Sequence, residues 1–125
     1  MEESLPHLYT KKNIADLFGR PEHFVKTLFT MGLPHSYLSG HAVVSKKAFW
    51  EWIGYEEPDL KNGSPFITLR TLAEETDMSK SAAYRMKDRL PDSVLLRFGN
   101  QFFVIKDRFY DWLLEESKQN PGGRL

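Results

Sequence analysis

Hydrophobic residues near the start of the chain recur with the spacing of a short amphipathic helix. Ile14, Leu17 and Phe18 fall on one helical face, at intervals of three and four residues. Thr10 stands just before this pattern, and its hydroxyl can accept a hydrogen bond from a free amide of the first turn. The pattern therefore predicts a helix capped by Thr10, and the Gly-Arg-Pro sequence at 19–21 predicts the tight turn that ends it.

A second helix and a hairpin are predicted next. Val25, Leu28 and Phe29 repeat the helical spacing, and Pro21 suits the first position of that helix. Residues 36–44 then place a glycine-containing turn between apolar runs, which is typical of a β-hairpin.

A last helix follows the hairpin. Phe49, Trp52 and Ile53 are three and four residues apart, which predicts that they face the core together. Trp50 lies off that face and is a candidate for contact with the second half of the chain.

The same order of residue classes returns in the second half of the chain. Residues 9–28 align with residues 67–86 at a spacing of 58. Thr68 then corresponds to Thr10 as a helix cap, and Ser79 is predicted to cap the next helix. The residues expected to face the second core are Ala83, Met86, Phe109, Trp112 and Leu113, while Tyr110 lies off the face as Trp50 does.

The repeat predicts two modules of one fold class. Residues 8–53 form the first module and residues 66–116 the second, joined by an acidic linker at 54–65 and followed by a flexible tail at 117–125. Helix, tight turn, helix, hairpin and helix is the order of a winged helix-turn-helix. We therefore expect a mainly α fold with small β-hairpin wings, present as two tandem winged helix-turn-helix modules.

The second module carries four motifs in a fixed order. They are a first helix with Thr, an apolar residue, Ala and an acid (68–74), a Ser-started helix ending in Tyr-Arg and an apolar residue (79–86), an Arg-bearing wing (97–104) and a final Trp-Leu (112–113). In these motifs the module resembles the excisionase-like, MerR-related winged helix-turn-helix family. The first copy is similar over residues 10–53. Membership would imply a DNA-binding protein of a phage or mobile element: an excisionase, a small repressor or a packaging subunit.

Charge is balanced overall but uneven along the chain. The sequence carries 17 basic and 17 acidic residues, which argues against a protein that coats nucleic acid non-specifically. Residues 1–60 have six cations and eight anions, whereas residues 61–125 have eleven and nine. Between Lys80 and Arg97 there are five cations and two anions, so the positive charge concentrates on the predicted second helix and wing of module 2.

These cations define the candidate site. Arginine can bind a guanine edge through two hydrogen bonds, and an arginine at a wing can enter a narrow minor groove. The alternative is that a basic helix face is simply solvated and that the wing turn only requires residues with positive φ. The predicted DNA-binding residues are Ser79, Lys80, Ser81, Tyr84, Arg85, Lys87, Arg97, Asn100 and Gln101.

Module 1 offers fewer cations at the equivalent places. Its second helix has a single lysine and its wing has no arginine. Weaker contacts to DNA, to a second copy of the chain or to a partner protein are expected from His23, Phe24 (predicted to be exposed), Lys26, Thr27 and His41.

Other chemistries have little support in the sequence. There are no cysteines, and the four histidines lack the spacing of metal ligands. No nucleotide-binding loop or nucleophile motif occurs, so we expect no catalysis, no cofactor, no metal and no small-molecule substrate. The acidic start, without a signal peptide or a long apolar run, predicts a cytoplasmic protein outside the membrane.

Two functions remain open at this point. The first is sequence-specific binding of double-stranded DNA, with module 2 dominant, in transcription regulation or recombination. The second is a protein-interaction adaptor, inhibitor or assembly subunit that uses the same scaffold without binding DNA.

Overall fold

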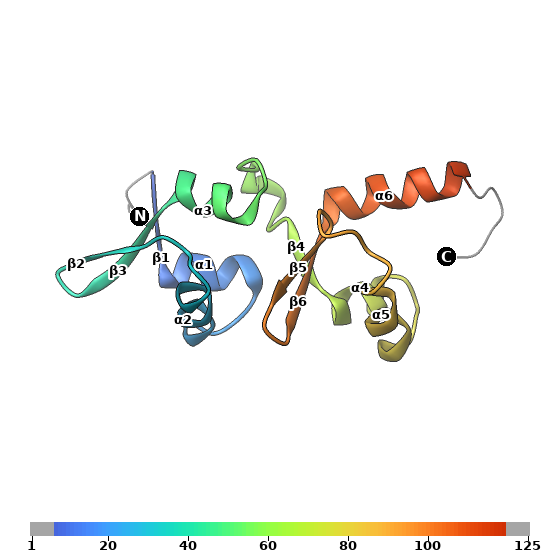
Figure 1. Ribbon diagram of the computed structural model, residues 1–125, viewed down its shortest axis with the longest axis horizontal. Helices are drawn as coiled ribbons and strands as arrows, with labels where there is room; N and C mark the ends of the chain where they lie inside the picture. The colour runs from blue at the N-terminus through green and yellow to red at the C-terminus, as the bar shows by residue number, and fades with distance from the viewer. Residues whose placement is uncertain (1–6, 120–125) are drawn as a thin grey trace. The chain divides into compact units, whose positions relative to one another are not determined.

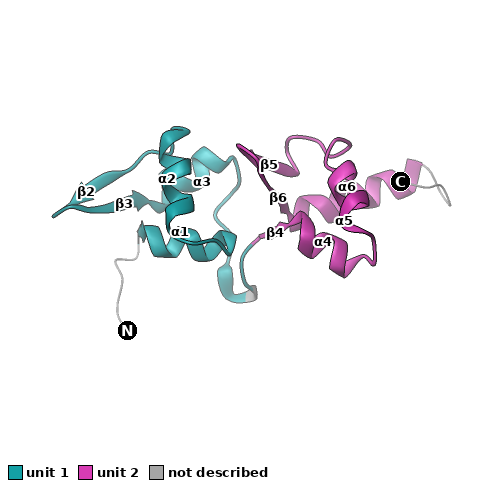
Figure 2. Ribbon diagram, turned by 90° about the horizontal axis from the view of Figure 1, so that it is seen from below, with its two compact units in different colours: residues 1–64 teal, residues 65–125 magenta. Residues whose placement is uncertain are grey.

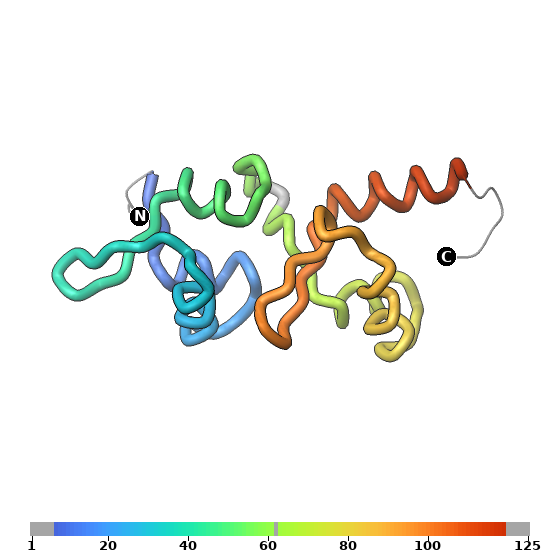
Figure 3. Tube along the Cα trace, viewed as in Figure 1, coloured from blue at the N-terminus to red at the C-terminus, as the bar shows by residue number. Residues whose placement is uncertain are grey.

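A computed structural model of the chain describes residues 7–119. The chain divides into two compact units, with unit 1 ending at Ser64 and unit 2 beginning at Pro65 (Figure 2). Each unit runs strand, helix, helix, strand, strand, helix (Figure 1), and the colour gradient in Figure 3 follows the chain through the two units in turn.

The described part of unit 1 contains one three-stranded sheet and three α-helices (Figure 1). A 3₁₀ turn, Leu60–Asn62, lies near its end, within the predicted linker. The elements are β1 (Leu8–Thr10), α1 (Lys11–Phe18), α2 (His23–Thr30), β2 (Ser36–Leu38), β3 (His41–Ser45) and α3 (Lys46–Ile53).

Unit 2 repeats this plan with a longer last helix. Helix α6 reaches Gln119, so residues 117–119 of the predicted tail are helical, and the rest of that tail lies outside the described residues. The elements are β4 (Phe66–Thr68), α4 (Leu69–Glu75), α5 (Lys80–Met86), β5 (Leu95–Phe98), β6 (Gln101–Ile105) and α6 (Lys106–Gln119).

The expected fold class is wrong, because each unit has a sheet rather than a hairpin wing alone. The structure is 48% helical with 21% strand, an α/β mix with six helices and two antiparallel sheets among the described residues. The strand orders are β1-β3-β2 and β4-β6-β5. The sequence reading missed β1 and β4, which are three residues long and stand directly before a helix, too short for an alternating pattern to be recognised.

The predicted helix caps are confirmed where a threonine or serine supplies the oxygen. Thr10 Oγ1 accepts from the amide of Asn13 at 3.1 Å, and Thr68 Oγ1 accepts from the amide of Thr71 at 3.1 Å. The proline prediction is wrong: α2 begins at His23, and the Pro21 carbonyl accepts from the Phe24 amide at 3.0 Å in the turn before it.

The turn after the first helix of each unit uses the left-handed region. Gly19 has φ 62°, and Asp77, which lies 58 positions later, has φ 57°. The repeat therefore extends to the backbone conformation, although only Gly19 adopts it without a Cβ penalty.

Unit 1 has an aromatic core that corrects two predictions. Phe24 was predicted to be exposed, but it is buried, with 2% of its surface accessible, and the centroids of its ring and the Phe18 ring lie 5.5 Å apart. Trp50, predicted to lie off the core face, is 3% exposed, and its Nε1 donates to Tyr9 Oη at 3.1 Å. Strand β1 explains the second error. It brings Tyr9 against the side of α3 that carries Trp50, a side that the spacing of Phe49, Trp52 and Ile53 does not assign to the core.

The core of unit 2 follows the predicted pattern more closely. Met86, Trp112 and Leu113 are partly buried and pack against a buried cluster. Tyr110 is 60% exposed, in contrast to Trp50 at the equivalent position. The buried cluster consists of Leu72, Leu90, Val94, Leu95, Val104 and Phe109.

Within residues 7–119, every helix is too short or too polar to cross a lipid bilayer.

Candidate nucleic-acid interface

Helix α5 presents one side to the core of unit 2 and the other to solvent. Ser79 Oγ caps it by accepting from the Ala82 amide at 3.0 Å. Ala83 is 1% exposed, which fixes the inward side. The exposed residues on the opposite side line a shallow hollow of about 500 Å³ and are Lys80, Ser81, Tyr84 and Arg85.

The hairpin β5–β6 approaches α5 through an aromatic contact. The rings of Tyr84 and Phe102 lie 6.1 Å apart in an edge-to-face arrangement. Arg97 is paired with Phe102 across the hairpin, and its guanidinium carbon lies 5.6 Å from the Phe102 ring. The structure therefore brings Tyr84 and Arg97 to one ring, although they are distant in sequence.

The residues at the hairpin turn differ in accessibility. Asn100 is exposed, as predicted, whereas Gln101 is partly buried. Gln101 Oε1 is buried without a hydrogen-bond partner, so this oxygen is turned away from any external ligand. Gly99 has φ 64°, whereas Asn100, the other residue of the turn pair, does not have a positive φ. The interpretation of the wing as a turn that needs positive φ at both residues is therefore met by Gly99 alone.

Lys87 is not a free cation, contrary to the prediction that it contacts DNA. It is 9% exposed, and its Nζ lies 4.2 Å from the Tyr84 ring and 5.4 Å from the Phe102 ring. The same ammonium lies 3.0 Å from Asp88 Oδ1. Lys87 therefore fills the space between α5 and the hairpin and holds Tyr84 in place.

The remaining cations of this face are not neutralised by the protein. Among the described residues, Lys80, Arg85 and Arg97 have no ion-pair partner. Exposed cations that carry no internal partner can bind an external anion without first breaking an ion pair.

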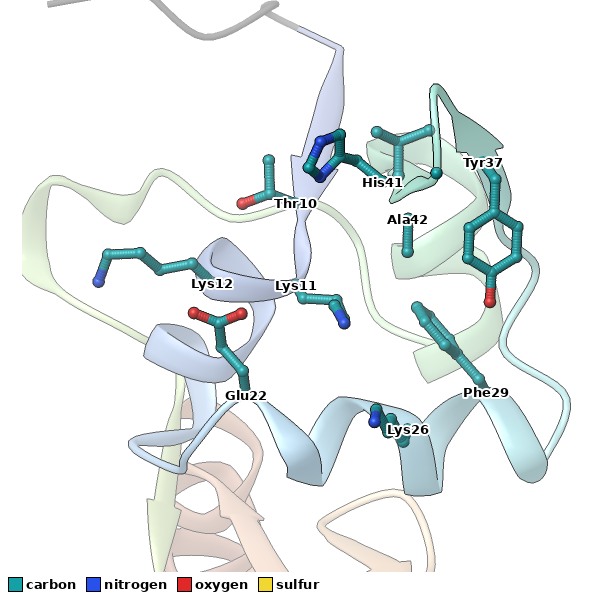
Figure 4. A pocket seen from close by; sticks show the side chains of 11 residues that line it. Thr10, Lys11, Lys12, Glu22, Lys26, Phe29, Tyr37, His41 and Ala42 are labelled. Atoms are coloured by element: carbon teal, nitrogen blue, oxygen red, sulfur yellow. The ribbon is translucent and has the colours of Figure 1, made fainter.

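The candidates in unit 1 are only partly brought together. His23, Lys26 and Thr27 are exposed on α2, whereas Phe24 is buried. Lys26 and His41 line a hollow of about 500 Å³ between the start of α1, helix α2 and the hairpin β2–β3 (Figure 4).

Sequence reasoning missed two lysines and two aromatic residues at this hollow. The missed residues are Lys11, Lys12, Phe29 and Tyr37. The pair of lysines directly after the Thr10 cap was the one available signal. Its proximity to α2 and the hairpin depends on β1, which was not predicted.

Comparison with known proteins assigns the chain to no family and gives it no function. Neither a family model, nor a curated protein, nor a solved structure matches the chain.

Proposed function

We propose that the protein binds double-stranded DNA sequence-specifically, without catalysis, and that unit 2 supplies most of the affinity. The observation that supports this best is a set of three exposed cations, Lys80 and Arg85 on α5 and Arg97 on the hairpin that contacts α5, which form no ion pair among the described residues. The excisionase-like resemblance supports a role in transcription regulation or recombination.

Helix α5 is the element proposed to enter the major groove. An α-helix fits the groove, and an arginine on its exposed side can donate two hydrogen bonds to guanine. Arg85 has that position, and Ser81 and Tyr84 flank it with hydroxyl groups. Asn100 and Arg97 then approach the neighbouring backbone or minor groove from the hairpin.

Two units in one chain would strengthen binding by tethering. Once unit 2 is bound, unit 1 is held at a high effective concentration near the same duplex. If both units bind, two half-sites about 10 base pairs apart are expected, one turn of the duplex.

Selection of bound duplexes from a random pool tests this proposal. We expect an enriched sequence, and on that sequence a log–log salt slope of about −4.5 to −5.5, corresponding to five or six phosphates. A chain that enriches no sequence and ignores duplex DNA at low salt would refute DNA binding.

A protein-interaction role is the second candidate, supported by helix α6. Tyr110 and Leu114 are 60% and 57% exposed, and they are four residues apart on one face. A partner protein that binds this face would be released by Leu114→Asp, whereas DNA binding through α5 would be unchanged.

A further inference from the structure

The hollow of unit 1 lies between α1, α2 and the hairpin β2–β3. It depends on which side chains stand at these positions, because unit 2 has the same order of elements but different side chains there. In unit 2 the equivalent space holds the Phe102 ring and the Lys87 ammonium. In unit 1 the position of Phe102 is taken by Ala42, which is likewise the second residue of its strand. The position of Lys87 is taken by Phe29, which lies 58 residues earlier in the chain. One small residue thus leaves open what a phenylalanine fills in the other unit.

Two lysines direct positive charge into this hollow. Lys11 points from α1 into the space between α2 and the hairpin, and Lys26 lines it from α2 (Figure 4). Among the described residues neither ammonium has an ion-pair partner. Lys12 points away, and its Nζ lies 3.4 Å from Asp16 Oδ2. Of the described residues in the lining, Glu22 alone carries a carboxylate.

An aromatic surface borders the same space. Phe29 and His35 are stacked with centroids 3.8 Å apart, and His35 meets Tyr37 edge-on at 5.5 Å. These contacts hold Tyr37 at the rim although the residue is 62% exposed. An exposed, positioned ring can stack on a planar ligand, and the nearby lysines favour one that is anionic.

We propose that the hollow of unit 1 binds a nucleotide, with its phosphate between Lys11 and Lys26 and its base against Tyr37. The hollow's volume of about 500 Å³ is in the usual range for small-ligand sites. An ammonium group that forms no ion pair can bind phosphate without first releasing a carboxylate, and Glu22 lines the hollow without being ion-paired to Lys11 or Lys26 among the described residues. The nucleotide can be free or the end of a single strand, since both present the same base and phosphate.

This site is independent of the proposed DNA-binding face, because none of its residues belongs to unit 2. The test titrates the full chain with dAMP, with dTMP, with a single-stranded (dT)8 and with inorganic phosphate, by calorimetry. We expect a nucleotide probe to bind at least tenfold more tightly than phosphate. Binding of dAMP or dTMP identifies a free nucleotide as sufficient, and binding of (dT)8 alone identifies a strand end.

Three variants assign the binding to the hollow. Lys11→Ala with Lys26→Ala should weaken nucleotide binding at least tenfold, and Ala42→Phe should weaken it by copying the filled space of unit 2. Tyr37→Ala should weaken nucleotide but not phosphate binding. Lys47→Ala, at an exposed lysine of α3 outside the lining, is the control for the loss of a lysine elsewhere in unit 1 and should change nothing.

Because Lys11, Lys26 and Tyr37 lie outside the buried core, their replacement should leave the fold intact even if Ala42→Phe does not. The proposal is overturned if no nucleotide probe binds up to about 1 mM, if phosphate binds as tightly as nucleotides, or if the lysine double variant keeps full affinity. Duplex binding by unit 2 would survive each of these results.

Discussion

The two units share one order of strands and helices but differ in the space between the second helix and the hairpin. In unit 2 this space is filled by Lys87 and Phe102, which support Tyr84 beside the exposed Arg85. In unit 1 it is open, lined by lysines and bordered by Tyr37. The difference shows that two units with the same order of elements can differ in which side chains lie between the second helix and the hairpin. One unit then presents a cationic helix face with a shallow hollow, and the other a lysine-lined hollow between helix and hairpin.

The last helix of each unit gives a second contrast. Trp50 is buried against Tyr9, whereas the equivalent Tyr110 is exposed. The counterpart of Tyr9 is Ile67, which offers no hydroxyl to a helix side chain. One hydrogen-bonded aromatic pair therefore belongs to unit 1 alone.

The largest expected effect is on stability and concerns the contrast between the buried Trp50 and the exposed Tyr110. Trp50→Ala should destabilise unit 1 by about 3–5 kcal/mol, because it empties a core position and removes the hydrogen bond to Tyr9. Tyr110→Ala should change stability by less than about 0.5 kcal/mol. Amide hydrogen exchange, followed separately in each unit by NMR, measures both, and equal effects would contradict the burial difference.

The next effect tests the charge contrast between the units. Replacing Arg85 and Arg97 together by Ala should weaken binding to a selected duplex about a hundredfold, or about 2.7 kcal/mol. Lys26→Ala should weaken it by less than about threefold, a change of roughly 0.6 kcal/mol. Fluorescence anisotropy at one salt concentration compares them, with Lys118→Ala as the charge-matched control for Lys26→Ala. Equal losses in the two units would overturn the dominance of unit 2.

A smaller effect concerns the turn that follows the first helix. Asp77→Gly should stabilise unit 2 by about 0.5–1 kcal/mol, because glycine has no Cβ to crowd the backbone in the left-handed conformation. Gly19→Asp should destabilise unit 1 by a similar amount, since no atom within 4 Å would clash with the added Cβ and only the backbone conformation matters. Urea unfolding of the matched pair measures the two shifts, which should have opposite signs.

The smallest effect is a dependence of stability on alkaline pH. Burial raises the pKa of Tyr9, the hydrogen bond from Trp50 opposes this, and Glu57 adds to it. Because the folded state holds the phenol proton more tightly, the stabilisation is complete below the unfolded pKa of about 10 and is lost as pH rises through the folded pKa.

Unit 1 should therefore lose stability above about pH 10 through this group, whereas Ile67 gives unit 2 no such loss. Tyr9→Phe should abolish the difference in slope between the units, in unfolding measured by circular dichroism from neutral to alkaline pH. An unchanged slope would show that other groups cause it.

Local sequence patterns predicted the elements that depend on neighbouring residues. The threonine and serine caps, the inward faces of α1 and α5 and the position of both hairpins follow from spacing and hydrogen-bonding groups a few residues apart. The exposure of Lys80, Ser81, Tyr84 and Arg85 was predicted for the same reason, since Ala83 and Met86 set the orientation of the helix.

The sequence by itself determined the duplication, the order of helices and hairpins and the concentration of positive charge in unit 2. The tertiary structure decided which residues are accessible, because β1 and β4 pair with strands more than 30 residues away and add a third strand to each sheet. That pairing buries Trp50, and packing on the hairpins withdraws Lys87 and assembles the hollow in unit 1. Contacts between residues so far apart leave no periodic signal, so only the folded chain reveals them.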